Sequence, residues 1–286
     1  MSRGFYLGCW CVALFCLHTA CENASSQAPQ HLTSAASGYA PASDKWTRAG
    51  LLPILGAPYP EQVPTPSMQA RRTEAQHLAL RHPGKVWING HLQRKAVALT
   101  FDDGPESVVT PQVLDILARY QLKATFFFVG FMLRKHAAVV KRTYHEGHLI
   151  LNHSYDHPSF DALSNAQIQS QLRRTEDLLF KLIGKRPALF RPPAGVIDNR
   201  IQAEIDAAGY QTILWSYDPF DWAGLPVDTL VQRVVSQARN GEIILLHSRL
   251  HTDSTAVALP RIIEGLQARG FELLRLDELI PVQAYR

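Results

Sequence analysis

The sequence predicts an α/β protein folded as a distorted, incomplete (β/α) barrel of about seven parallel strands. Two observations support this fold class. From Lys95 onward, short apolar runs alternate strictly with amphipathic segments, giving seven strand–helix units, and such alternation is typical of a parallel sheet that curls toward a barrel. Polar residues follow these runs, at the carboxyl ends of strands, where folds of this class place their active sites.

The predicted strands are short runs of aliphatic, β-branched and aromatic residues. In chain order they cover residues 96–101, 124–129, 148–152, 188–190, 210–216, 242–246 and 271–274. The first run, Ala-Val-Ala-Leu-Thr-Phe, is apolar almost throughout, which indicates a buried strand.

The helices between the strands are predicted from capping residues and from apolar spacing. Thr110 is expected to cap the first helix, with Pro111 at its first position. A second helix ends near Gly147. The remaining helices are predicted to run from the cap Ser164 to Gly184, from the cap Asp198 to Gly209, and over residues 228–240 and 256–269.

Residues 1–21 are predicted to be a signal peptide. Arg3 precedes a short apolar run and small residues before Cys21, which is typical of a secretory leader. The segment 17–21 resembles a bacterial lipoprotein processing site, although His18 departs from that pattern. We therefore expect a lipoprotein-type signal with a lipid on Cys21, a plain signal peptide or an uncleaved anchor being the alternatives. All four cysteines lie in this leader (Cys9, Cys11, Cys16 and Cys21), so the rest of the chain has no disulfide framework.

Residues 22–85 are predicted to be a flexible tether followed by a Pro-rich extension. The first part is rich in Ala, Ser, Gln and Pro. Leu51, Leu52, Ile54 and Leu55 are apolar enough to dock on the folded domain. The prolines at 53, 58, 60, 64 and 66 are expected to prevent a long helix before residue 90. The folded domain is expected to span residues 86–286.

Composition is that of an ordinary globular protein, with 46% hydrophobic residues. The formal net charge of +4 is too small to argue for nucleic-acid binding, and no nucleic-acid partner is expected.

The main chemical signal lies in two segments. Asp102 and Asp103 follow the first strand, and His153 and His157 come about fifty residues later. One carboxylate and two imidazoles form a ligand set for a divalent metal, with one carboxylate left to act as a base. Each segment has a simpler interpretation by itself, because Asp-Asp-Gly-Pro is good turn chemistry and the histidines could be partly exposed.

Further polar residues end other strands, and they favour function over turn chemistry. Arg191 follows the fourth strand, Asp218 and Asp221 follow the fifth, and His247 ends the sixth. Several such placements in one chain are hard to explain by stability alone.

The order of these motifs resembles the NodB-type polysaccharide deacetylases, carbohydrate esterase family four, over about residues 86–279. The resemblance implies a distorted (β/α) barrel with one divalent metal, usually zinc, while cobalt or another divalent ion remains open. It implies removal of acetyl groups from N-acetylated, and sometimes O-acetylated, sugars.

The resemblance also implies roles for residues around the metal. Asp103, His153 and His157 would hold the ion. Asp102 would act as the general base toward the attacking water, and Arg191 would pair with Asp102 and orient it.

Further roles concern the leaving group and the substrate. His247 would be the general acid that protonates the amine, and Asp221 would keep it protonated. Trp222 and Leu245 would wall the acetyl pocket, and the backbone amide of Ala194 would help to hold the oxyanion. Ala194 departs from the family pattern, which often has an aromatic residue there.

The sequence therefore predicts an exported, envelope-tethered, metal-dependent deacetylase. Peptidoglycan N-acetylglucosamine or a chitin-like glycan is the expected substrate, and the membrane is the expected partner through the N-terminal lipid or leader. Two alternatives stay open: a hydrolase of a small amide or cyclic imide, and a non-catalytic sugar-binding protein. The complete set of catalytic residue types argues against the second.

Overall fold

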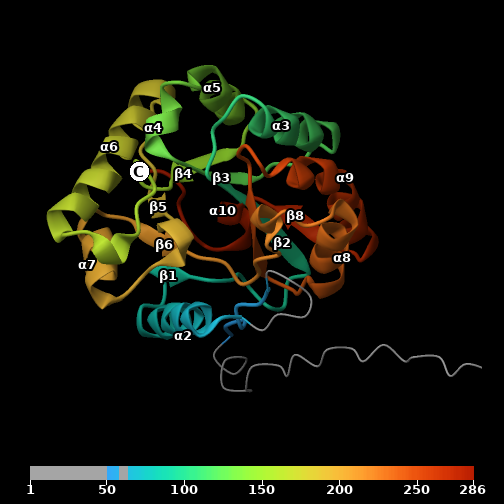
Figure 1. Ribbon diagram of the computed structural model, residues 1–286, viewed down its shortest axis with the longest axis horizontal. Coiled ribbons are helices and arrows are strands. Elements are labelled where there is room, and N and C mark those ends of the chain that lie inside the picture. Colours follow the sequence, from blue (N-terminus) through green and yellow to red (C-terminus); the bar gives the residue numbers. More distant parts are fainter. Residues whose placement is uncertain (1–49, 58–63) are drawn as a thin grey trace, which may run out of the picture. The chain divides into compact units, whose positions relative to one another are not determined.

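The computed structural model describes residues 50–57 and 64–286, which belong to the second of two units of the chain, Ala40–Arg286 (Figure 1). The predicted signal peptide, with Cys21, and the first part of the predicted tether lie outside the described residues.

The strands form one parallel sheet in the order β1-β6-β5-β4-β3-β2-β7, with β8 beside β2. They are β1 (Val86–Trp87), β2 (Ala96–Asp102), β3 (Thr125–Phe128), β4 (Leu149–Asn152), β5 (Leu189–Phe190), β6 (Gln211–Ile213), β7 (Glu242–His247) and β8 (Glu272–Leu274). All seven predicted strands are confirmed. β1 was not predicted, because two residues are too short to show a pattern.

The barrel nearly closes just beyond β6. Tyr217 forms a parallel bridge with Ile244 of β7 and another with Leu55. Asn89, just after β1, forms an antiparallel bridge with Glu242 of β7. Isolated bridges in place of a full strand pairing thus join the two ends of the curled sheet, and the barrel is distorted and incomplete, as predicted.

Helices cover the outer side of the strands (Figure 1). They are α2 (Pro66–Arg81), α3 (Val109–Arg119), α4 (Gly130–Leu133), α5 (Ala137–His145), α6 (Asn165–Ile183), α7 (Asn199–Ala207), α8 (Val227–Gln237) and α9 (Asp253–Ala268). The short α10 (Leu276–Leu279) instead lies within the ring of strands in Figure 1. The caps Ser164 and Asp198 and the left-handed Gly184 are confirmed. Among the described helices, none has the length and apolar character needed to cross a membrane.

The prediction that Thr110 caps the first helix is wrong. Helix α3 already begins at Val109, without a side-chain cap from its N-cap residue. The carboxylate of Glu106 instead accepts hydrogen bonds from the backbone N–H groups of Val108 and Thr110, both at 2.7 Å. The Thr110 hydroxyl donates to the Ser248 carbonyl oxygen at 2.7 Å, so it ties the helix to the loop after β7.

The expectation that prolines prevent a long helix before residue 90 is also wrong. Helix α2 has 16 residues and begins at Pro66, the last of these prolines. Proline is tolerated at the first helical position because its missing N–H would have no helical partner there. Leu78 is fully buried and packs with Val86 and Ile88, so α2 is part of the folded unit.

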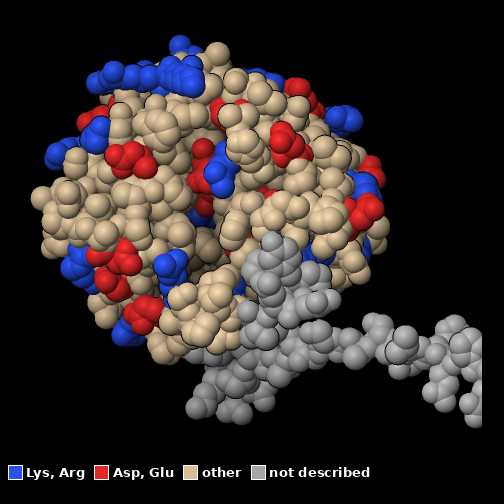
Figure 2. Space-filling view, in the orientation of Figure 1, with Lys and Arg blue, Asp and Glu red and all other residues tan. Residues whose placement is uncertain are grey.

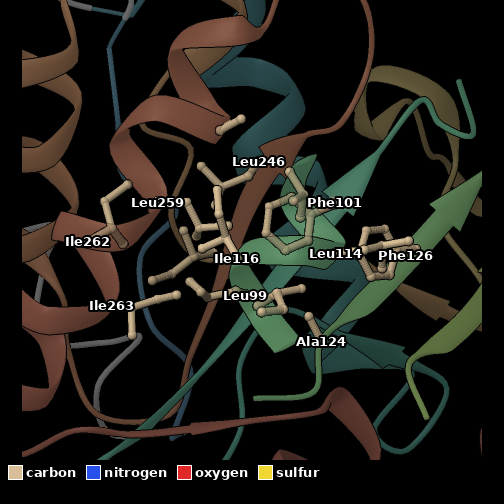
Figure 3. Packing of buried hydrophobic residues seen from close by; sticks show 14 of the residues in the cluster. Leu99, Phe101, Leu114, Ile116, Ala124, Phe126, Leu246, Leu259, Ile262 and Ile263 are labelled. Carbon is tan, nitrogen blue, oxygen red and sulfur yellow. The ribbon is translucent and has the colours of Figure 1, made fainter. Parts of the chain in front are cut away.

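Alternation along the strands separates two cores. Leu99, Phe101 and Phe126 face the outer helices, where they pack against α3 and α9 (Figure 3). Ala98 and Phe127 face the barrel interior, in a cluster that also contains Leu276 and Leu279 of α10. The same period of two determines which polar side chains can enter the barrel.

Candidate active site

The strand register brings the predicted base and acid to one end of the barrel. Asp102 ends β2, His247 ends β7, and the two residues are paired in register. Thr100 and Asp102 alternate with the outward-facing Leu99 and Phe101, so they point to the interior. His247 alternates in the same way with the outward-facing Leu246.

Asp103 lies where β2 turns away from the sheet, with a left-handed φ of 70°. Its Oδ1 is 3.4 Å from Nε2 of His153 and 3.2 Å from Nε2 of His157. This oxygen is buried and accepts no hydrogen bond from any described residue. Two imidazole nitrogens thus converge on a carboxylate oxygen that has no proton donor.

Each histidine is oriented by a contact with a neighbouring loop. Nδ1 of His153 donates to the Arg191 carbonyl oxygen at 2.8 Å, which leaves Nε2 as a lone-pair donor. The backbone N–H of His157 donates to Oγ of Ser154 at 3.1 Å. Ser154 and His157 both have left-handed φ angles, 67° and 57°, and such strained conformations cluster at functional sites.

The three side chains fit a divalent cation. One ligand atom from each of Asp103, His153 and His157 lies within 4.8 Å of the others. Burial opposes ionisation of Asp103, but the imidazoles of His153 and His157, when they carry protons, outweigh it and hold the pKa of this carboxyl well below its usual range. A bound metal would take the place of those protons and leave both imidazoles neutral. A charged oxygen and two neutral nitrogens form a suitable ligand set for a three-ligand site with open positions.

Arg191 holds Asp102 from behind. It is fully buried, and its Nη1 donates to Oδ1 of Asp102 at 2.8 Å and to the Thr100 hydroxyl at 2.9 Å. Its Nε and Nη2 donate to the carbonyl oxygens of Ile213 and Leu214 at 3.2 and 3.0 Å. The guanidinium group is therefore fixed by four contacts, and it fixes one oxygen of Asp102 in turn.

Asp221 holds His247 in a similar way. Its Oδ1 accepts a hydrogen bond from Nδ1 of His247 at 2.8 Å, and its Oδ2 accepts one from the His247 backbone N–H at 2.7 Å. The Thr255 hydroxyl donates to the same Oδ2 at 2.6 Å. Burial by itself would lower the pKa of His247, but the charge and hydrogen bond of Asp221 raise it to about 9.

One pocket of about 330 Å³ collects most of the predicted site residues. Those that line it are Asp102, Asp103, His153, His157, Ala194, Trp222, Leu245 and His247. Arg191 and Asp221 are fully buried and contact the pocket only through Asp102 and His247. In Figure 2 this face of the molecule is hollowed near its centre, with acidic and basic groups at the rim.

Sequence reasoning missed several residues of the site. Nε of Arg249 lies 3.0 Å from Oδ2 of Asp103. Arg249 lies in the loop after β7, and its closeness in sequence to His247 was the available signal. Asp218 was predicted to follow the fifth strand but had no predicted role; it lines the pocket, and burial raises its pKa to about 6. Thr255 comes from α9, and no motif marks it.

Residues 89–213 match the family model described as polysaccharide deacetylase. The chain is 39% identical over 189 residues to a peptidoglycan-N-acetylglucosamine deacetylase of Bacillus cereus, covering 65% of this chain and 88% of that protein. It is 38% identical over 195 residues to the peptidoglycan-N-acetylmuramic acid deacetylase PdaC of Bacillus subtilis, covering 68% of this chain but only 40% of the relative.

The fold agrees with this match. The crystal structure of a peptidoglycan N-acetylglucosamine deacetylase bound to a hydroxamate-type benzamide superposes with a TM-score of 0.68 at 34% identity, covering 70% of this chain and 94% of that one. The sequence match, the half-barrel of parallel strands and the metal-ligand triad agree, and they show that this chain belongs to the polysaccharide deacetylase family and is a metal-dependent deacetylase.

Proposed function

We propose that the protein removes the N-acetyl group from sugars of peptidoglycan, with N-acetylglucosamine as the first candidate and a chitin-like glycan as the second. The observation that carries this proposal is the convergence of three metal-ligand side chains, a carboxylate and a cationic imidazole in one pocket. The activities named for the relatives in Bacillus cereus and Bacillus subtilis support the choice of glycan.

Asp103, His153 and His157 would hold the metal, which we propose to be zinc. When bound, the metal polarises the amide carbonyl and makes a water molecule more acidic. Two features of the chain suit a metal at this place. The Oδ1 of Asp103 accepts no hydrogen bond from the described residues, and the contact of Nδ1 of His153 with the Arg191 carbonyl oxygen leaves Nε2 with a lone pair.

Asp102 would be the general base. Arg191 occupies its Oδ1 at 2.8 Å, so Oδ2 remains to take the proton from the attacking water. Because Arg191 is itself anchored to backbone carbonyl oxygens, Asp102 keeps its orientation while the proton moves. Arg191 is thus a positioning residue.

His247 would be the general acid. Asp221 engages Nδ1, which leaves Nε2 to give a proton to the departing amine. With a pKa of about 9, the imidazole is charged at neutral pH and can donate as soon as the carbon–nitrogen bond breaks. Asp221 acts on this step through His247.

Substrate contacts are proposed for three residues of the pocket wall. Trp222 and Leu245 would enclose the acetyl methyl group, and the backbone N–H of Ala194 would stabilise the oxyanion. Ala194 has a left-handed φ of 51°, a conformation that aims its amide differently from an extended residue and costs strain.

The proposed location is the cell envelope. A lipoprotein-type signal at 1–21, a lipid on Cys21 and a tether after it would place the catalytic domain beside the cell wall. Replacement of Cys21 by Ser should abolish lipidation and membrane partitioning in cell fractionation. Wild-type protein recovered freely soluble with an unmodified start elsewhere would contradict the anchor.

Acetate release tests the function directly. Metal-stripped full-length protein is reconstituted with zinc or cobalt and assayed for acetate release from peptidoglycan glycan, chitin oligomers and acetylated xylan, and for ring opening of a cyclic imide. We expect metal-dependent acetate release, greatest on peptidoglycan glycan. Turnover of the imide alone would favour a small-amide hydrolase, and glycan binding without turnover by any metal form would indicate a non-catalytic sugar-binding protein.

A further inference from the structure

Part of the pocket wall comes from a segment that precedes the family match. Ile54, Met68, Arg71 and Ala75 line the same pocket as the catalytic side chains. The match to the family model starts only at residue 89. This wall, formed by residues 50–57 and α2, is called the extension wall below.

The extension wall is joined to the barrel by backbone pairing. The N–H of Leu55 donates to the Ser216 carbonyl oxygen at 2.9 Å, and the N–H of Asp218 donates to the Leu55 carbonyl oxygen at 3.0 Å. Gly56 has a φ of 120°, and a Cβ there would lie 1.7 Å from the Asp218 carbonyl oxygen. Only glycine allows this approach, so the wall has a fixed place beside the pocket-lining Asp218.

Arginines of the barrel and of α2 hold the remaining backbone of the wall. Arg233 donates to the Ala57 carbonyl oxygen at 2.6 Å, and Arg239 donates to that of Pro53 at 3.0 Å. Nη2 of Arg72 donates to the Gly56 carbonyl oxygen at 2.9 Å. A wall anchored in this way is preorganised, which reduces the ordering cost of binding a ligand.

Charge indicates what the extension wall can bind. Among the described residues, the arginines that border the pocket are Arg71, Arg72 and Arg249. Arg249 pairs with Asp103, and Arg72 bonds to the backbone of the wall. Arg71 is exposed on α2 and makes no hydrogen bond or ion pair with any described residue, although Asp161 lies within its electrostatic reach.

The planar fork of an arginine matches a carboxylate with two parallel hydrogen bonds. Met68 and Ile54 line the same pocket and supply apolar surface for a sugar ring. The wall therefore combines a cation with apolar surface next to the catalytic groups.

We propose that the extension wall is a glycan subsite in which Arg71 binds a carboxylate on the sugar next to the one that loses its acetyl group. The inference rests on the proposed function and adds a substrate class, an acidic glycan in preference to a neutral N-acetylglucosamine polymer. Such a carboxylate occurs on the lactyl ether of a muramic-type sugar and on a uronic acid, and the test separates these two sources.

The test compares matched tetrasaccharides on the full-length protein. One contains N-acetylglucosamine only, one alternates it with a sugar bearing a free lactyl carboxylate, one has that carboxylate amidated, and one alternates it with a uronic acid. Wild type should show the lowest KM on one of the carboxylate substrates, and amidation should remove the advantage. The advantage should also shrink at high salt, because screening weakens exposed charge pairs.

Arg71→Gln should raise KM for the preferred acidic tetrasaccharide roughly 3- to 10-fold relative to the neutral one, with kcat nearly constant. Arg81→Gln is the matched control, because Arg81 lies on the same helix but pairs with Glu74 and does not line the pocket.

Equal KM ratios for Arg71→Gln and wild type, with wild type active on glycans, would overturn the subsite and leave the proposed function intact. A wild-type preference for the neutral tetrasaccharide would overturn it as well. Failure of the metal-loaded wild type to release acetate from any glycan would overturn the proposed function and the subsite together.

Discussion

Two clusters of the active site use the same residue types in different ways. On the metal-ligand side, Asp103 approaches Nε2 of His153, while Nδ1 of that ring donates to a backbone carbonyl oxygen. On the acid side, Asp221 accepts from Nδ1 and from the backbone N–H of His247. The first imidazole is left with a lone pair for a metal, and the second is held as a cation. The role of each histidine follows from which ring nitrogen its carboxylate contacts.

The largest loss of activity is expected when a metal ligand is removed. His153→Ala or His157→Ala should lose the metal and at least three orders of magnitude in rate, because two remaining ligands hold a divalent ion poorly. Metal content by atomic spectrometry and acetate release measure both effects. His145→Ala, an exposed histidine on α5, is the control. A double variant of His153 and His157 that kept full activity without metal would show that these histidines are not ligands.

A smaller loss of activity is expected from a change that tests the separate roles of Asp102 and Asp103. Asp102→Asn should keep the metal and lose about two to four orders of magnitude in rate, since the base is removed but no ligand is. Metal titration and acetate release are measured on the same preparation. If the metal is lost together with activity, the roles of Asp102 and Asp103 are exchanged.

The contact between Asp221 and His247 predicts how activity depends on pH. His247 must be protonated to donate, and its pKa is raised to about 9, so activity should fall only as pH rises through about 9. Asp221→Asn removes the main charge that raises this pKa, so the alkaline limb should move toward lower pH. The pH–rate profiles of the two proteins measure this shift.

Removal of the proposed general acid, His247, provides a second test of its role. His247→Ala should retain metal and lose most amide hydrolysis, but lose less on an activated ester whose leaving group needs no proton. Equal losses on both substrates would assign His247 a structural role and would contradict its assignment as the cationic proton donor.

A third histidine, His148, is expected to make the free energy of unfolding depend on pH. His148 is buried, its Nδ1 accepts from the Ala124 N–H at 3.0 Å, and its nearest carboxylate oxygen, from Glu146, is 3.7 Å from Nε2. Burial and, less strongly, Lys123 lower its pKa from 6.5 to about 4. The group therefore stabilises the fold fully above pH 6.5, and its contribution is lost as pH falls toward 4, by about 3 kcal/mol.

Denaturant unfolding between pH 7 and 4 measures this loss. His148→Asn keeps an acceptor for the Ala124 N–H but has no proton to bind, so its stability should fall less over the same range. Parallel curves for wild type and variant would show that His148 does not control the acid sensitivity.

Much of the site could be predicted because its residues end strands that are visible in the sequence. Asp102, Asp103, His153 and His247 each follow an apolar run whose alternation determines the inward face. Thr255 could not be predicted, because it meets Asp221 only through the packing of α9 on the barrel.

Helix α2 was missed for a different reason. Ala75 and Ala79 beside Leu78 make its buried face, and small residues give a weak amphipathic signal. The nearby prolines also obscured its start, since Pro66 begins the helix that the run of prolines was expected to prevent.

The pairing of Leu55 with residues 216–218, just after β6, has a practical consequence for recombinant work. A fragment cut at residue 86 would remove the backbone partners of Ser216 and Asp218 and uncover Tyr217, which is 1% exposed in the intact fold. The loss would fall on the seam of the barrel, next to the catalytic pocket. Fragments for crystallisation or screening should therefore begin before Gly50, even though the family match starts about forty residues later.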